Sequence, residues 1–463
     1  MAKVRPISGF PEWLPEQRLA EQQVLDLIRE AFERFGFAPI ETRAVEPLDW
    51  LLAKGETDKE IYVVRRLQAE TAEGERGARG EPDDADLGLH FDLTVPFARY
   101  VAQNRARLAF PFRRYQIQKS WRGEKPQEGR YREFYQADAD VIAEGELPLA
   151  YDAEMVEVLH EVTAAMPIPP VTVRINHRKV LEGFYRGLGV VDAQPALRAA
   201  DKLDKIGEQG VRQLLAGEVG LGEEAAGKAL ELARIKGADG AGIAARVRAL
   251  GVGHELLDRG LGELAWVLGA VAHLPAGAYE ADLRIARGLD YYTGIVYEGT
   301  MVGYESLGAV CSGGRYDDLA SGGGGDEDGA SRGPKLPGTG ISIGVSRILG
   351  RLFADGALGA SRATPACVLV ALTGEELRAE SLAVARALRR RGIPCEVHPT
   401  AQKYGKQIRH AERKGIPYVW FPRGDATGGH EVRDIVTGEQ AAADPERWEP
   451  PEERRRVRLV TRG

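Results

Sequence analysis

Cysteine and histidine are scarce in this chain of 463 residues. The three cysteines, Cys311, Cys367 and Cys395, stand far apart, and the eight histidines do not cluster. This spacing argues against a disulfide framework and against a four-thiolate zinc site. The sequence also lacks any apolar run near the ~20 residues that span a bilayer, and its first residues lack the apolar stretch of a signal peptide. We therefore predict a cytoplasmic protein without a membrane partner.

Positive charge is in slight deficit, because 62 lysines and arginines stand against 69 aspartates and glutamates. The net charge of −7 argues against non-specific adhesion to nucleic acid, so any RNA contact must use a local basic patch. The motif Gly-x-x-x-x-Gly-Lys-Ser/Thr is absent, which argues against a generic P-loop ATPase. The length, with 43% hydrophobic and 28% charged residues, fits a globular protein of about two to four domains.

Periodicity along the first third of the chain predicts a helix, a strand and a hairpin. Apolar residues recur every three or four positions over 14–35, which predicts an amphipathic helix that ends at Gly36. A strand is expected at 37–45. Segments 114–121 and 131–142 alternate between apolar and polar residues around a turn-rich connection, which predicts an antiparallel hairpin.

The rest of the chain divides into loops, a helical stretch and a terminal module. The polar, Gly-rich stretches 68–86 and 321–337 predict loops, and helical spacing over 194–275 predicts a helical insertion. Beyond Ala360 strands alternate with helices, which is typical of a small α/β domain. The predicted elements are a strand and helix within 338–353, strands at 367–372, 394–398 and 418–421, and helices at 375–391 and 403–414.

Residues 287–298 read Arg-Gly-Leu-Asp-Tyr-Tyr-Thr-Gly-Ile-Val-Tyr-Glu. The segment alternates like a half-buried strand, and it combines a planar cation with phenols and carboxylates. Its first glycine lets the backbone approach a ligand closely. The residues alone indicate either the lining of a polar pocket or an interface strand with a solvated arginine.

The hairpin carries a cluster of cations between Ser120 and Gln136: Arg122, Lys125, Arg130 and Arg132. Fixed guanidinium groups suit a polyphosphate, because they neutralise its charge without reorganising during reaction. The alternative is a charged hairpin that is merely solvated. Strand parity adds that Gln136 and Asp140 share one face of the second strand.

The amino-acid sequences of these motifs resemble those of the histidyl-tRNA synthetases, a family of class II aminoacyl-tRNA synthetases. Residues 287–292 match a signature of that family. Residues 120–136 resemble its second class motif, and their sequence is most similar to that motif in the eukaryote-type branch. Residues 91–100, 310–317 and 338–347 resemble further family segments. The resemblance covers nearly the whole chain, apart from the helical insertion and the Gly-rich loop.

The resemblance implies an α+β protein with an antiparallel class II sheet flanked by helices. It divides the chain into a catalytic domain in two parts, 1–193 and 278–358, a helical insertion at 194–277, and a C-terminal α/β anticodon-binding domain at 362–463. It further implies ATP-dependent activation of L-histidine to histidyl-adenylate with release of pyrophosphate, followed by transfer to the 3′ end of histidine tRNA. ATP as substrate, Mg²⁺ and a homodimer come with the family.

The resemblance also carries roles residue by residue. Arg122 and Arg287 are expected to be catalytic. The expected ATP-binding residues are Arg122, Glu124, Arg130 and Arg347. The expected histidine-binding residues are Asp92, Thr94, Gln136, Asp140, Arg287, Tyr291 and Tyr292. Gln127 and Arg132 are expected to approach the acceptor end of the tRNA. The basic helix at 403–414 is expected to be solvated or to contact RNA.

Two positions depart from the family pattern. Arg43 stands where the first class motif has a proline, which leaves the dimer interface open, and Ser346 replaces the glutamate before Arg347, which leaves the Mg²⁺ ligands open. An alternative is a non-catalytic paralogue that senses histidine and regulates histidine biosynthesis. Such paralogues lack the anticodon module and lose ATP-binding arginines, whereas this chain keeps Arg122, Arg347 and residues 362–463.

Overall fold

The computed structural model describes residues 5–52, 60–65, 87–285, 291–317, 319, 335–422 and 429–462, apart from the side chain of Asp204. They form two compact units: a larger unit of residues 1–11 and 27–350, and a smaller unit of residues 12–26 and 351–463. The predicted loop at 68–86, most of the one at 321–337, and Arg287 lie outside the described residues. The four domain boundaries inferred from the sequence stay a prediction.

The larger unit is built on a nine-stranded sheet with the order β1-β5-β6-β12-β11-β10-β7-β9-β8. Neighbouring strands run antiparallel except for the pairs β1–β5 and β7–β9, so the predicted antiparallel core is confirmed. The predicted hairpin is also confirmed as β5 and β6. The strands are β1 (Ala38–Pro39), β5 (Phe112–Trp121), β6 (Glu133–Ile142), β7 (Val171–His177), β8 (Lys236–Gly237), β9 (Tyr279–Asp282), β10 (Tyr292–Met301), β11 (Ala309–Tyr316) and β12 (Gly338–Gly344).

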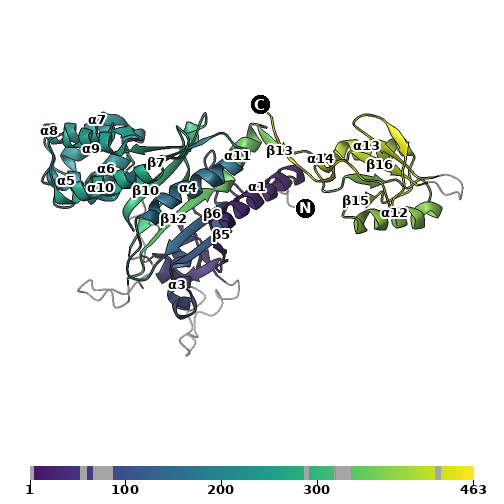
Figure 1. Cartoon of the computed structure of the whole chain (residues 1–463), viewed down its shortest axis with the longest axis horizontal. Coiled ribbons are helices and arrows are strands. Elements are labelled where there is room, and N and C mark those ends of the chain that lie inside the picture. The colour runs from purple at the N-terminus through teal and green to yellow at the C-terminus, as the bar shows by residue number, and fades with distance from the viewer. Residues whose placement is uncertain are drawn as a thin grey trace. The chain divides into compact units, whose positions relative to one another are not determined.

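Strand alternation gives the sheet an apolar face and a polar face near β6. Ala137, Ala139 and Val141 point to the apolar face, which is covered by α4 (Ala150–Ala165) and the end of α1 (Pro15–Arg34) (Figure 1). The ring of Tyr115 on β5 lies 5.7 Å from that of Phe32 on α1, and its hydroxyl donates to Glu33 at 2.9 Å. The predicted amphipathic helix is therefore confirmed, and its apolar stripe closes this side of the sheet.

The polar face of β6 is covered only at one end, by α3 (Thr94–Asn104). Phe97 of α3 packs under the Arg114 guanidinium, whose central carbon lies 4.2 Å from the ring centroid. Beside α3, a small sheet has the order β2-β4-β3, formed by Val45–Pro47, Leu87–Leu89 and Val63–Val64, with α2 at Leu48–Leu52. The remainder of the polar face is left as the floor of a pocket.

The prediction of a single strand at 37–45 is wrong for the middle of that segment. Only β1 and β2 form, and residues 40–44 between them are not in a strand. Ile40 still donates its backbone N–H to Tyr115 at 3.0 Å, and Thr42 then accepts from the Gln116 amide at 2.9 Å. The chain therefore leaves the edge of the large sheet and joins the small one, a change of partner that local propensity does not encode.

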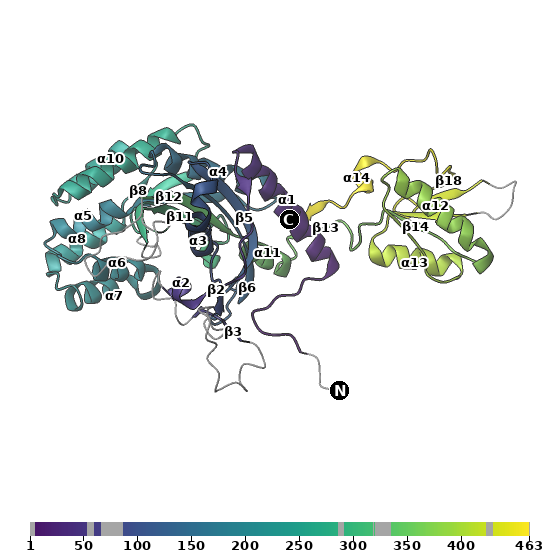
Figure 2. The same cartoon turned by 90° about the horizontal axis from the view of Figure 1, so that it is seen from below.

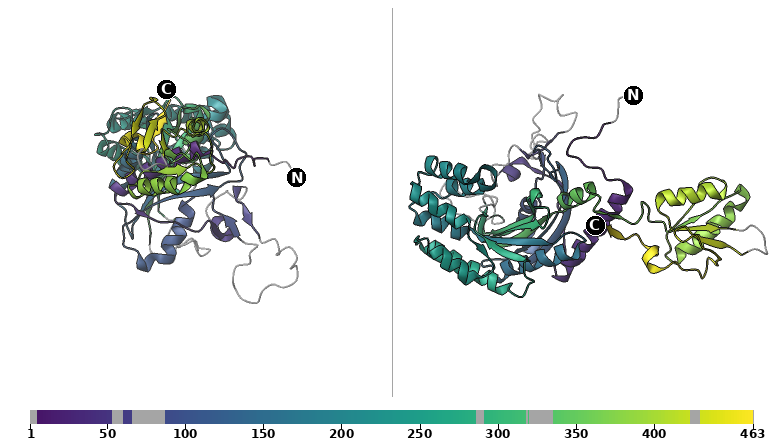
Figure 3. Two further views of the ribbon diagram at one scale, coloured as in Figure 1. Left: turned by 90° about the vertical axis from the view of Figure 1, so that its right-hand side faces the viewer. Right: turned by 90° about the horizontal axis from the view of Figure 1, so that it is seen from above.

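The helical insertion is confirmed as a set of helices gathered beside β7 and β8 (Figures 2 and 3). The short strand β8, which sequence periodicity did not predict, joins this region to the main sheet. The helices are α6 (Gln194–Asp201), α7 (Leu203–Gly217), α8 (Glu223–Ala233), α9 (Gly240–Arg248) and α10 (Glu255–Ala270), and α5 (Arg178–Gly187) precedes them.

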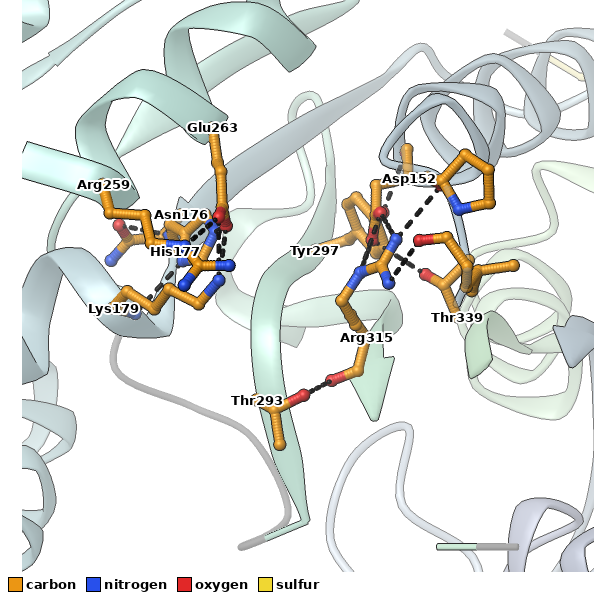
Figure 4. A network of polar contacts seen from close by, with 12 residues as sticks. Asp152, Asn176, His177, Lys179, Arg259, Glu263, Thr293, Tyr297, Arg315 and Thr339 are labelled. Atoms are coloured by element: carbon orange, nitrogen blue, oxygen red, sulfur yellow. Dashed lines mark hydrogen bonds and ion pairs between the residues drawn. The ribbon is translucent and has the colours of Figure 1, made fainter. Parts of the chain in front are cut away.

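Two polar clusters fix helices to the main sheet (Figure 4). In the first, Glu263 of α10 lies 2.6 Å from Nε2 of His177 at the end of β7 and 2.8 Å from Nζ of Lys179. In the second, the buried Asp152 of α4 accepts from Nε of Arg315 on β11 at 3.0 Å and from the hydroxyl of Thr339 on β12 at 3.2 Å. The clusters hold α10 and α4 at fixed positions on the sheet.

The smaller unit contains a five-stranded sheet with the order β15-β14-β16-β17-β18. Val384 and Leu388 of α12 (Arg378–Arg390) belong to the core on one face of the sheet, and Ala411 of α13 (Tyr404–Lys414) belongs to the core on the other. The predicted α/β alternation is confirmed as β14 (Val368–Val370), η6 (Glu375–Leu377), α12, β15 (Cys395–Val397), α13 and β16 (Tyr418–Phe421).

The remaining elements complete the described chain. They are η4 (Arg105–Arg107), η5 (Glu305–Leu307), α11 (Val345–Ala354), β17 (Glu431–Asp434), β18 (Gln440–Ala442), α14 (Glu452–Arg455), and the separate pair β13 (Leu358–Ala360) and β19 (Leu459–Thr461). No helix among the described residues is long and apolar enough to cross a membrane.

The Asp152 cluster generates a stability prediction. We expect Asp152→Ala to lower the free energy of unfolding by about 3–5 kcal/mol, because it leaves the Arg315 charge buried and uncompensated. Urea unfolding followed by circular dichroism measures this loss. The matched control is Glu144→Ala, which breaks an exposed ion pair with Arg105 and should cost about 0–1 kcal/mol. Equal losses in the two variants would contradict the role given to Asp152.

Candidate active site

A pocket opens on the polar face of the sheet, between the β5–β6 hairpin and the start of α11. Its lining includes Arg122, Glu124, Arg130 and Arg347, the four residues that the sequence assigned to ATP. Gln136 and Ser342 lie on its floor, and Phe134 supplies an aromatic wall. The pocket therefore combines three guanidinium groups with a flat apolar surface, a combination that suits a nucleoside polyphosphate.

The hairpin turn holds two of these arginines in place. Gly129 has a φ of +68°, which lets the backbone reverse so that Gln127 and Arg130 bond to each other at 2.9 and 3.2 Å. A guanidinium nitrogen of Arg130 then lies 3.2 Å from a carboxylate oxygen of Glu124. Arg122 donates its Nε to the carbonyl of Phe91 at 2.9 Å and lies over the Phe134 ring.

Deeper on the same face lies a row of buried polar side chains. Asp140 on β6 contacts Arg114 on β5 at 2.7 Å, and its other oxygen accepts from the hydroxyl of Tyr316 on β11 at 2.9 Å. Four residues earlier on β6, the Gln136 amide donates to the Ser342 hydroxyl at 2.7 Å. These side chains come from four adjacent strands, so only the assembled sheet brings them together.

The loop before α3 adds a further carboxylate to this site. Asp92 is buried, and one of its oxygens accepts from the backbone N–H of Val95 at 3.0 Å. Burial raises the pKa of Asp92, against the opposing effects of that hydrogen bond and of the Arg122 charge. Thr94, the first residue of α3, is partly exposed. No contact of its side chain is described.

Two tyrosines close the site, Tyr292 as the first residue of β10 and Tyr291 just before it. The rings of Tyr291 and Tyr292 lie 4.8 Å apart, and Tyr291 lies 6.2 Å from the Tyr316 ring. Removal from water raises the pKa of both phenols, and the negative charge of Asp92 raises them further. Both tyrosines therefore remain neutral at physiological pH, and their hydroxyls can donate hydrogen bonds.

Glycine is required on the pocket floor at β11 and β12. A Cβ atom at Gly340 would lie 2.0 Å from an oxygen of Asp140, and one at Gly314 would lie 3.0 Å from the Tyr292 ring. Any larger residue would displace the side chains that form the site. The glycines thus serve close approach rather than flexibility.

Many buried polar atoms at this site have no hydrogen-bond partner within the part of the chain that the structure describes. They include Oδ2 of Asp92, Oε1 of Gln116, Oε1 of Gln136, Oδ1 of Asp138, and Nε and Nη1 of Arg114. Buried polar groups in folded proteins are almost always paired. Their concentration on one face therefore indicates a site for a polar ligand that supplies both donors and acceptors.

A larger cavity adjoins the site and extends to the helical insertion. It shares Arg122, Glu124, Arg130 and Arg347 with the first pocket, and α5 to α7 contribute Arg178, Arg198, Lys202 and Lys205 to its lining. This cationic rim suits additional phosphate groups. It was not predicted from the sequence, because these four residues occur in a helical stretch of ordinary composition.

The structure thus brings most of the predicted residues to one sheet face. Gln127 is exposed at the hairpin turn, and the partly exposed Arg132 donates its Nε to the Glu124 carbonyl at 3.1 Å. Arg287 lies outside the described residues. The sequence reasoning missed Arg114, Gln116 and Asp138, although strand parity places Asp138 between Gln136 and Asp140.

No ready-made metal site is present among the described residues. They contain no group of three or more histidine, cysteine, aspartate or glutamate side chains that could hold a metal ion. The hydroxyl of Ser346 instead accepts a hydrogen bond from the backbone N–H of Tyr135 on β6 at 2.8 Å. A Mg²⁺ ion at this pocket would therefore take most of its oxygen ligands from a bound polyphosphate and from water.

An antiparallel sheet with a cationic pocket on one face and a separate α/β unit defines the class II aminoacyl-tRNA synthetase fold. The crystal structure of a histidyl-tRNA synthetase from Nostoc is similar over 96% of this chain and 97% of its own, with a TM-score of 0.81 and 35% identity. Family models named "Histidyl-tRNA synthetase" and "Anticodon binding domain" match residues 9–348 and 366–445. The chain belongs to the histidyl-tRNA synthetase family.

Curated relatives agree with that assignment. A histidine–tRNA ligase of Micrococcus luteus is 53% identical over 98% of both chains. One of Cutibacterium acnes is 50% identical over 98% of both, and one of Thermobifida fusca is 51% identical over 96% of this chain and 97% of its own. These relatives are bacterial, although the wording of the second motif is nearest the eukaryote-type branch.

The glycine at position 340 provides a test of the site geometry. We expect Gly340→Ala to raise the KM for histidine on the order of tenfold or more, because the added methyl group displaces the Asp140 carboxylate and its hydrogen bonds. The KM for ATP should change far less. Pyrophosphate exchange measures both constants. Gly262→Ala on α10, where an added Cβ meets nothing within 4 Å, is the control, and a similar effect on both substrates would contradict this geometry.

Proposed function

We propose that this protein is a histidine–tRNA ligase. It would activate L-histidine with ATP to form histidyl-adenylate and pyrophosphate, and then transfer histidine to the 3′ end of histidine tRNA. The observation that carries this proposal is the pairing of a cationic pocket with a carboxylate-rich pocket on one sheet face, in a chain of this family. The relatives named above are ligases, which favours catalysis over the histidine-sensing alternative.

Arg122, Arg130 and Arg347 are the proposed ligands of the ATP phosphates, and Glu124 lies near the adenine or its ribose. Their support is that all four line one pocket. Mg²⁺ is proposed as the ion that accompanies ATP, and when bound it would neutralise phosphate charge. The residues described here supply positioning and positive charge, which are the main catalytic needs of attack at a phosphate.

Asp92, Thr94 and Gln136 are the proposed partners of the histidine α-amino group. In support, Oδ2 of Asp92 and Oε1 of Gln136 are buried and have no hydrogen-bond partner among the described residues. Asp140, with Tyr291 or Tyr292, is proposed to bind the imidazole nitrogens. The histidine carboxylate is already ionised at neutral pH, so its attack needs no general base. Arg122 and Arg287 would instead stabilise the charge that develops at the α-phosphate.

The tRNA acceptor end is proposed to approach Gln127 and Arg132, which lie at the outer side of the hairpin. The cations from α5 to α7 would attract its phosphates. The smaller unit is the proposed anticodon-binding part, in keeping with the family model that matches it. A homodimer and a cytoplasmic location complete the proposal.

The decisive test is pyrophosphate exchange across the amino acids, together with charging of histidine tRNA. Histidine-specific exchange and charging are the expected results. Histidine binding with neither exchange nor charging would favour the sensing paralogue, and exchange without charging would indicate a repurposed adenylating enzyme.

Arg287 supports a kinetic prediction. We expect Arg287→Ala to slow adenylation by on the order of 10²–10³, because loss of a preorganised donor acts on charge that grows only in the transition state. Histidine affinity should change little. Single-turnover adenylation measures the rate, and Arg259→Ala on the surface of α10 is the control. A wild-type rate with only a raised KM for histidine would remove Arg287 from the reaction step.

Arg132 should separate the two steps of the reaction. We expect Arg132→Ala to slow charging of histidine tRNA about tenfold or more while pyrophosphate exchange stays near the wild-type rate, because its proposed partner is tRNA. Exposed Arg107 supplies the control variant, Arg107→Ala. If Arg132→Ala slows exchange as much as charging, the residue belongs to the ATP pocket.

A further inference from the structure

The two carboxylates near the end of β6 differ in how the protein uses their oxygens. Both oxygens of Asp140 are engaged, one by Arg114 at 2.7 Å and the other by the Tyr316 hydroxyl at 2.9 Å. Asp138 is 1% exposed, yet its Oδ1 has no hydrogen-bond partner among the described residues. Oδ2 of Asp140 likewise makes no hydrogen bond, but it has the Arg114 ion pair, whereas Oδ1 of Asp138 has neither among the described residues.

A second unpaired acceptor lies next to Asp138. Gln116 is directly opposite Asp138 in the β5–β6 pair. Its amide nitrogen donates to Thr42 at 2.9 Å and to Gln118 at 2.6 Å, while its Oε1 has no partner among the described residues. Two buried acceptors on neighbouring strands require a donor. A proton on Asp138 would supply one.

The charges around Asp138 also indicate that its carboxyl group holds a proton. The carboxylates of Asp92 and Asp140 and the guanidinium of Arg114 act on Asp138, and Asp138 in turn acts on the Tyr292 phenol. From β12, the only group described against it is the neutral Ser342 hydroxyl. Arg122 in turn acts on Asp92, so three carboxylates stand against two arginines in the ligand-free site. A single negative charge is left, which one proton neutralises.

We propose that Asp138 is a further specificity-determining residue, which holds one proton in the ligand-free protein and shares it with a ring nitrogen of bound histidine. This inference rests on the proposed function. When histidine binds, the O–H bond at Oδ1 lengthens or breaks as an N–H bond to the imidazole forms. Asp140 would contact the other ring nitrogen, and Tyr291 and Tyr292 would then pack against the ring instead of binding a nitrogen. Among the common side chains, only the imidazole has a ring nitrogen that accepts a proton near neutral pH. Asp138 would therefore select histidine.

The proton has a measurable consequence for affinity. Burial raises the pKa of Asp138 to about 7, with Arg114 opposing and Asp140 reinforcing the shift. Below that pH the proton is already present, so histidine binds without uptake at this group. Above it, the proton must come from solvent, and affinity should fall up to about tenfold per pH unit. Asp138→Asn removes this dependence, because its amide does not titrate.

The experiment uses calorimetry of histidine binding to the full-length protein in two buffers with different ionisation enthalpies. At pH 8.5 the wild type should take up nearly one proton more than Asp138→Asn, and the comparison cancels the titration of the histidine amino group. At pH 7, Asp138→Asn should lower kcat/KM for histidine in pyrophosphate exchange by about 10- to 100-fold, as expected for loss of a hydrogen bond to a charged group. Asp258→Asn, exposed on α10, is the control.

A stability measurement separates this role from a purely structural one. Because the pKa of Asp138 is raised on folding, its contribution to stability is full below the unfolded value of 3.8 and is lost as pH rises through about 7. Asp138→Asn should therefore keep or raise the Tm of the ligand-free protein at pH 8. A lowered Tm with an unchanged pH profile would assign Asp138 to folding alone.

The outcomes distinguish this inference from the proposed function. If the wild type fails to activate histidine, the proposed function fails. If the wild type activates histidine but its affinity does not change between pH 7 and 8.5, or if Asp138→Asn matches it in proton uptake and kcat/KM, only the role of Asp138 is overturned. The pH dependence of histidine affinity in the wild type tests the role of Asp138 even if the Asp138→Asn variant does not fold.

Discussion

The buried contact between Arg114 and Asp140 is the interaction on which the rest of the site depends. Both side chains are almost fully removed from water, with exposures of 0% and 3%. An isolated charge at this depth would be strongly destabilising, so each requires the other. The pair fixes β5 and β6 in register. It also orients Asp140 so that its second oxygen meets Tyr316 from β11.

This requirement explains the small residues around the pair. Gly340 leaves room for the Asp140 carboxylate, and Gly314 leaves room for the Tyr292 ring. On the opposite face, Ala137 and Ala139 allow helices to cover the sheet. The centre of the molecule is therefore polar on one side and apolar on the other, as expected when a sheet both forms a core and binds a ligand.

The site is also held from outside the sheet. Asp152 and Arg315 fix α4 to β11, and Glu263 with His177 fixes α10 to the end of β7. These contacts lie outside the lining of the cationic pocket, and they hold the helices on the sheet that forms its floor. Rigid supports of this kind let charged groups act without reorganising, which is the condition for electrostatic catalysis.

Local patterns in the sequence predicted much of this protein. The period-two hairpin of β5 and β6, the amphipathic α1, the helical insertion and the alternation in the smaller unit all follow from spacing that neighbouring residues alone decide. The motif arginines could be assigned to one pocket because the sequences of the motifs that contain them are specific to a family. The strand at 37–45 was mispredicted because its residues change partner between two sheets.

The sequence by itself determined most of the elements and which side chains share a strand face, since both depend on local periodicity. Only the tertiary structure decided that Arg114 would neutralise Asp140, that Asp138 would keep an open oxygen beside Gln116, and that α5 to α7 would bring cations to the rim. Residues far apart in the chain make these contacts, and the free energy of a buried charge depends on what surrounds it in space.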